Sequence, residues 1–262
     1  MELLRPPSYT PPFWRSPVAR KNRVSEAIYR HHIRLFRFLN DAWIFTTLMR
    51  PLLKEKGDAL IGSKSKAKKE YPVPKKDRTV SSRRRDEDVG ALFLAQHGRG
   101  IYDTNIISII SRVEAFIQDC MFEAVKQYPE KLAIIGGKSG IPLDLYLKHE
   151  DRDDLLEVFI ALRCQDLMFG KPSEYLAKAA EVLSIQLKPD VIATYVEMKA
   201  SRDLIIHNGG RINQLYLDKA GRKARGEIDD ELDIDEDYFE EVIVNAKALS
   251  GTIQRETEKK YG

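Results

Sequence analysis

Segment 202–210 gathers side-chain types that handle phosphate. Arg202, Asp203, His207 and Asn208 stand close together just before a pair of glycines. On a helix, at about 100° per residue, Asp203 and His207 share one face, and the long guanidinium of Arg202 reaches toward the same side. A guanidinium offers a planar fork of donors to phosphate oxygens, and an imidazole exchanges protons near neutral pH. The segment therefore predicts a helix end equipped for phosphate chemistry.

The spacing of the arginine and the histidine is a loose pattern by itself. A chain with five histidines is expected to contain about one such match by chance. A histidine beside an aspartate at a helix end can also be a simple capping group. The functional interpretation therefore depends on the sequence around the segment.

Helical periodicity dominates the chain and predicts an all-α fold of five or six helices. The apolar spacing indicates a long helix that Pro51 interrupts and a strongly apolar one that Pro129 ends. Pro189 opens the helix that carries the candidate site, and the glycine pair closes it. We find no convincing alternating strand. The expected helices are 22–50, 103–127, 153–169, 173–183, 189–208 and one from Tyr238 to the C-terminus.

Composition narrows the class of protein. The net charge of +3 hides a basic segment at 54–95, with most cations in 54–85, and an acidic segment at 227–241. Cys120 and Cys164 lie in separate apolar helical patterns, which is typical of free thiols in a reducing cytosol. No apolar run is long enough to cross a membrane, and the Pro-rich residues 1–17 do not resemble a signal peptide. We therefore expect a cytoplasmic protein.

The basic segment is expected to be a mobile loop. Such a loop could steer a polyanion, since phosphate contacts give sequence-independent affinity, or it could be a solvated linker. The opposed charges of the basic and acidic segments also suit a protein partner.

Two motif-like stretches fail on their spacing. Lys138-Ser139 resembles the end of a phosphate-binding loop, but Leu132 stands where the first glycine is required. The aspartates from Asp233 begin like a calcium loop, but Tyr238 replaces the essential glycine and Val244 the glutamate. We therefore expect no metal and no cofactor.

Three blocks resemble one family. The segment SRDLIIHNGGRINQLYL, residues 201–217, resembles the C-terminal catalytic helix of the HEPN superfamily, in particular its RiboL-PSP branch. Residues 108–132, with Glu114 and Phe116 and a final Tyr-Pro-Glu, are similar to an early helix of that family. Residues 168–185 are similar to the connection between its middle helices, so the resemblance covers about 100–215.

This resemblance implies a four- to five-helix bundle that is often a homodimer and usually a metal-independent endoribonuclease. Such proteins act in toxin–antitoxin pairs or in phage defence, so RNA and an antitoxin or another protein encoded nearby are the implied partners. The expected organisation is an N-terminal arm with an additional long helix at 1–53, the basic loop at 54–95 and a HEPN-like bundle at 96–262.

Roles for the site residues follow from the chemistry of RNA cleavage by its own 2′-OH. That reaction needs a general base, a general acid and a cation on the phosphorane oxygens. We assign proton transfer to His207, phosphate binding to Arg202, and orientation of the imidazole or a water to Asp203. One plausible catalytic histidine per chain predicts a composite site between two copies.

Several alternatives stay open. Asn208 is a substrate donor or a helix-end cap, and Glu114 faces the site or bonds Arg202. Tyr216 is expected to pack in the core. The main rival function is an inactive HEPN-type dimerisation or RNA-binding module. A second rival is a target for nucleotidyl transfer, for which Tyr195 and Tyr216 are the candidates.

Overall fold

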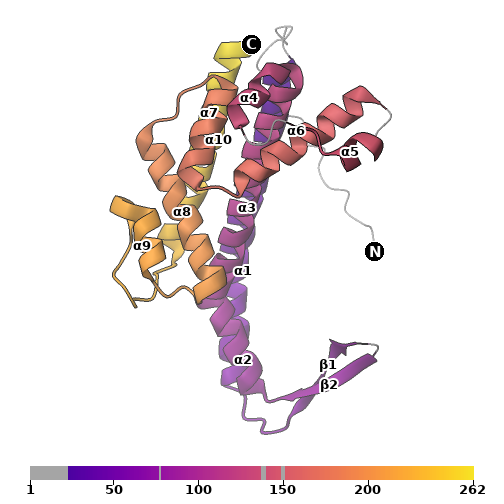
Figure 1. Cartoon of the computed structure of the whole chain (residues 1–262). Helices are drawn as coiled ribbons and strands as arrows, with labels where there is room; N and C mark the ends of the chain where they lie inside the picture. The colour runs from indigo at the N-terminus through magenta and orange to yellow at the C-terminus, as the bar shows by residue number, and fades with distance from the viewer. Residues whose placement is uncertain (1–22, 77, 137–139, 149–150) are drawn as a thin grey trace, which may run out of the picture.

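The computed structural model describes residues 23–76, 78–136, 140–148 and 151–262, and these form a mostly helical fold, as predicted (Figure 1). The expected Pro-rich arm at 1–17 lies outside the described residues. Two long helices, α1 and α3, run along the length of the molecule, and α7, α8 and α10 pack beside them.

Helix α1 spans Arg23–Ile61 and continues through Pro51, so the predicted end at residue 50 is wrong. A proline removes one helical hydrogen bond but does not stop a helix that packing holds on both sides. Beyond the proline, α1 packs against α2, Asp86–Ala95. A Cβ atom on Gly90 would lie 3.0 Å from the carbonyl oxygen of Gly57, so the two backbones approach closely there. Tertiary packing therefore extends the helix.

The basic segment 54–95 is not a loop. It comprises the end of α1, an antiparallel hairpin of β1 (Lys69–Lys75) and β2 (Arg78–Arg84), and α2. The sequence hid the strand β1 because it contains Pro72 and Pro74, which a two-stranded ribbon tolerates on its open edge. The hairpin projects away from the helices (Figure 1).

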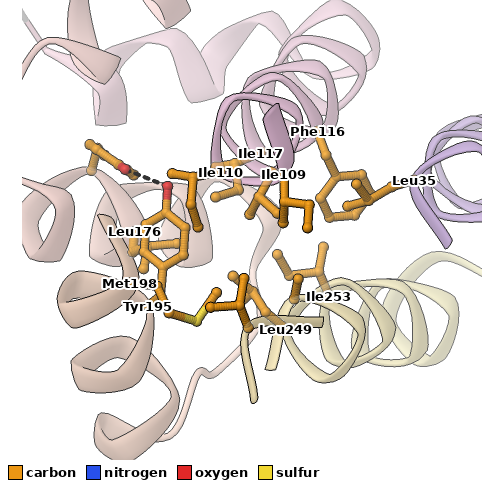
Figure 2. Packing of buried hydrophobic residues seen from close by; sticks show 14 of the residues in the cluster. Leu35, Ile109, Ile110, Phe116, Ile117, Leu176, Tyr195, Met198, Leu249 and Ile253 are labelled. Carbon is orange, nitrogen blue, oxygen red and sulfur yellow. Dashed lines mark hydrogen bonds between the residues drawn. The ribbon is translucent and has the colours of Figure 1, made fainter. Parts of the chain in front are cut away.

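Helix α3, Ile101–Gln127, is the centre of the core. It follows α2 through a π-helical turn, η1, Gln96–Gly100, and it begins two residues before the predicted start. Four of its isoleucines are fully buried, namely Ile106, Ile109, Ile110 and Ile117. Figure 2 shows the last three of them between Leu176 on one side and Leu35 on the other. Because Leu35 belongs to α1, that helix is an integral part of the core.

The second half of the chain forms the remaining helices, α4 to α10. Asp151 caps α6 by accepting bonds from two backbone N–H groups. The connection 211–226 contains α9, and the acidic segment 227–241 pairs with its start through a bridge between Arg211 and Glu231. These helices are α4 (Leu132–Ile135), α5 (Leu143–Lys148), α6 (Arg152–Met168), α7 (Pro172–Leu183), α8 (Pro189–Asn208), α9 (Gln214–Ala220) and α10 (Glu236–Tyr261).

The structure can be compared with the expectations of free cysteines and of no membrane-spanning helix. Cys120 and Cys164 are both free and buried. Among the described residues, no helix is long and apolar enough to cross a membrane.

Candidate active site

Helix α8 presents the predicted site at its C-terminal end. Gly209 and Gly210 both adopt positive φ angles, 59° and 80°, as the glycine pair predicts. The N–H of Gly210 donates to the carbonyl of Leu204 and closes the helix. A side chain on Gly210 would overlap the guanidinium of Arg99, which comes from the π-helical turn. The end of α8 is therefore fixed by its own turn and by a neighbouring element.

Three cations converge on Asp203. Its carboxylate accepts from Lys199 Nζ at 3.2 Å, from Arg202 Nη1 at 3.0 Å and from Lys219 Nζ at 3.4 Å. Burial acts to raise the pKa of Asp203, but the surrounding cations outweigh it and hold the pKa below its usual range. Asp203 is thus an ionised hub that positions three positive groups.

Arg202 keeps donor capacity for a ligand. One of its terminal nitrogens bonds Asp203, and the other reaches Ser111 Oγ on α3 at 3.4 Å. Its Nε atom is buried and has no hydrogen-bond partner among the described residues. An unpaired buried N–H is costly, so a small shift of the side chain that brought Nε to a bound anion would be favourable.

His207 is exposed, and its imidazole forms no hydrogen bond or ion pair within the described chain. The predicted contact between Asp203 and the imidazole is absent, because Lys199, Arg202 and Lys219 occupy the carboxylate. The imidazole is therefore free to meet a substrate or a second chain.

These side chains line a pocket of about 420 Å³, formed by α8 and α9. The pocket can accept a phosphate group, since three positive side chains and one negative side chain surround it. Its polar lining includes Lys199, Arg202, Asp203, His207, Asn208 and Lys219.

The structure bears on two open alternatives and on one prediction. Glu114 pairs with Lys199 Nζ at 3.1 Å rather than with Arg202, so it joins α3 to α8. Asn208 donates its side-chain amide to the carbonyl of Arg211, which supports the helix-end cap. Tyr216 is buried, as predicted.

Sequence reasoning missed a buried carboxylate behind the pocket. Glu197 accepts from Ser201 Oγ at 2.6 Å, from Tyr216 OH at 3.0 Å and from Tyr238 OH at 3.1 Å. Burial raises the pKa of Glu197, although these donors and Arg225 act against the rise. The network ties α8 to α9 and α10. The signal in the sequence is a Glu and a Ser one helical turn apart, a spacing at which helical side chains meet.

The two lysines of the hub were also missed. Lys199 stands four residues before Asp203, a spacing at which helical side chains meet, so the sequence did contain its signal. Lys219 comes from α9 and could be assigned only from the fold.

The nucleotidyl-transfer interpretation loses its candidates. The side chains of Tyr195 and Tyr216 are each only 2% exposed. The hydroxyl of Tyr195 bonds that of Tyr175 at 2.6 Å. Neither tyrosine is accessible to a modifying enzyme in the folded chain.

Comparison with known proteins adds no family to these observations. No family model, curated protein or solved structure matches the chain. Within the described residues, no group of three or more His, Cys, Asp or Glu side chains is arranged to hold a metal ion.

Proposed function

We propose that this chain is a metal-independent endoribonuclease of the HEPN type. The observation that carries the proposal is the pocket at the end of α8, where Asp203 gathers three cations beside the unpaired imidazole of His207. The cations suit a phosphodiester, and the imidazole suits proton transfer.

In the proposed reaction, the 2′-oxygen of RNA attacks the adjacent phosphorus. The 2′-O–P bond forms and the P–O5′ bond breaks, while a base takes the 2′-OH proton and an acid protonates O5′. Arg202 binds the phosphate and stabilises the charge that grows on its oxygens, and Lys199 and Lys219 add to the positive field. The products are a 2′,3′-cyclic phosphate and a 5′-OH, so DNA is not cut.

A homodimer would complete the site by supplying a second imidazole. The outward face of α1 exposes several large apolar side chains, including Phe45 (55%) and Leu48 (65%), and Ile206 beside His207 is 42% exposed. Large apolar side chains left exposed on a helix face are typical of an interface between proteins. We propose that two copies meet here, in a toxin–antitoxin or phage-defence role with RNA as the substrate.

The test is an RNA digest with purified protein in excess EDTA, followed by end-group analysis. Wild type should leave cyclic phosphate and 5′-OH ends, and His207→Ala should lose at least about 100-fold in rate. Arg202→Lys keeps the charge but loses the fork, so it should also be slower. Circular dichroism verifies the folding of both variants. Cleavage by His207→Ala at the wild-type rate would exclude the mechanism.

An inactive RNA-binding module is the second candidate. It is favoured by the lack of any orienting partner for His207 in the described chain, because an active imidazole is usually held in one orientation. Intact RNA after incubation with wild type, together with measurable RNA binding, would support this alternative.

A further inference from the structure

The exposed face of α3 forms a floor between α1 and α8. Ser111 and Arg112 are neighbours on this face, and both are exposed. Ser111 Oγ contacts Arg202 of α8, while the guanidinium of Arg112 lies 4.2 Å above the ring of Phe38 on α1. The surface is therefore continuous from the candidate active site to α1.

The wall formed by α1 carries a row of arginines. Arg30, Arg34 and Arg37 recur at the spacing of one helix face and are all exposed. With Arg112 they line a shallow depression of about 1300 Å³. We call these four arginines the arginine strip.

Most of the arginine strip is electrostatically uncompensated. Arg30 pairs with Glu26 at 3.2 Å, but Arg34, Arg37 and Arg112 form no ion pair within the described chain. Asp41 is the acidic side chain in the lining of the depression. Clustered cations of this kind raise the local concentration of a polyanion.

The chemistry of the depression favours single-stranded nucleic acid as the occupant. A row of guanidiniums can track a repeating phosphate backbone. The ring of Phe36, 37% exposed, also borders the depression, and Lys247 Nζ lies 5.0 Å from its centroid, so one more cation stands beside the arginines. On the floor toward the active site, the hydroxyl of Ser111 donates to the carbonyl of Ile107 and accepts from Arg202, which fixes the guanidinium at the end of this surface.

We propose that the arginine strip binds the sugar–phosphate backbone of single-stranded RNA on one side of the scissile phosphate. The proposal rests on the ribonuclease function, because the same strand crosses α3 at Ser111 to reach Arg202. It assigns to α1, which lies outside the family resemblance, a role in holding the substrate.

The experiment measures RNA binding in a His207→Ala background, which prevents cleavage. A labelled single-stranded RNA of about 20 nucleotides is titrated at salt concentrations from about 50 to about 200 mM. The test variant combines Arg34→Gln, Arg37→Gln and Arg112→Gln. The matched control combines Arg152→Gln, Lys171→Gln and Lys260→Gln, exposed cations outside the depression.

Loss of three phosphate contacts should reduce the slope of log K against log salt by about 2, since each contact contributes about 0.7 on a single strand. Affinity at low salt should fall at least about tenfold. The control triple should stay within about twofold of the parent. The double variant Arg34→Gln/Arg37→Gln repeats the test without disturbing the Phe38 ring.

Three outcomes would overturn the proposal. The first is an equal loss of RNA affinity in the test and control triple variants. The second is an unchanged salt slope in the test triple variant. The third is that poly-glutamate displaces the labelled RNA as strongly as unlabelled RNA does at equal charge. The last outcome would indicate a surface for acidic proteins. If wild type binds RNA through the arginine strip but does not cleave it, the proposed ribonuclease function is refuted and the proposed RNA binding by the strip is not. Cleavage with a neutral strip would refute the strip alone.

Discussion

Gly209 and Gly210 provide a matched pair for testing how the end of α8 is held. Both have positive φ, so an alanine costs about 1 kcal/mol at either position. Only at Gly210 does the new Cβ meet a side chain, the guanidinium of Arg99. Arg99 bonds Asp103 at 3.1 Å and also pairs with Glu231. Gly210→Ala must displace it and weaken both ion pairs.

The magnitude follows from the exposure of those partners. Asp103 is 25% exposed and Glu231 is 73% exposed. The first pair should contribute most of the loss and the second little. We therefore expect Gly210→Ala to reduce the free energy of unfolding by about 3 kcal/mol and Gly209→Ala by about 1 kcal/mol.

Urea denaturation followed by circular dichroism measures both values. A double-mutant cycle isolates the contact. In an Arg99→Ala background, the cost of Gly210→Ala should fall to that of Gly209→Ala. Equal costs for the two glycine variants in the wild-type background would refute the argument that Arg99 supports the end of α8.

Three further predictions concern ionisable groups. Hydrogen bonds to Asp119 and Glu123 raise the pKa of His31 from 6.5 to about 9, so the folded chain holds this proton more tightly. The resulting stabilisation of the fold is complete below pH 6.5 and is lost as the pH rises through about 9. Because Asp119 is half exposed, this stabilisation is limited to about 1–2 kcal/mol. The variant His31→Gln lacks the group, so it should flatten the curve of denaturation midpoint against pH. Asp203→Asn should raise the affinity for inorganic phosphate about tenfold by calorimetry, because the three cations lose their internal counter-charge; unchanged affinity would contradict the hub. Glu197→Ala leaves three buried hydroxyls without their acceptor and should destabilise the fold by about 3 kcal/mol in urea titrations; a loss below about 1 kcal/mol would show that water replaces the carboxylate.

The sequence predicted the elements whose signals are local. The glycine pair marked the end of α8, and Pro129 marked the end of α3. The strong apolar period of 103–127 also predicted the helix α3. These features depend on backbone geometry and on one helix face, and both can be read from a single segment.

Signals that depend on tertiary contacts misled the prediction. Pro51 has the local character of a helix end, but packing of α1 on α2 overrides it. The prolines of β1 argue against a strand, yet pairing with β2 supplies one. In both cases contact with another element decided the local structure.

The sequence predicted which residues of α8 form the candidate site but not which side chains pair with one another. Arg202, Asp203 and His207 lie around one pocket, as their helical spacing indicates. The partners of Asp203 could not be ranked from α8 alone, because Lys219 enters from α9. A carboxylate pairs with the cations that the fold places within a few ångströms of it, and those cannot be known from one helix.

The carboxylate of Asp203 has a consequence for how an incoming phosphate is selected. It already offsets part of the positive charge that a phosphate would use, so an incoming phosphate competes with an internal anion for the same donors. A singly charged diester gains little in this competition, whereas a phosphorane with two negative charges competes better for the same donors. Asp203 therefore sets a charge threshold that weakens ground-state binding more than transition-state binding, which is the condition under which binding energy accelerates a reaction.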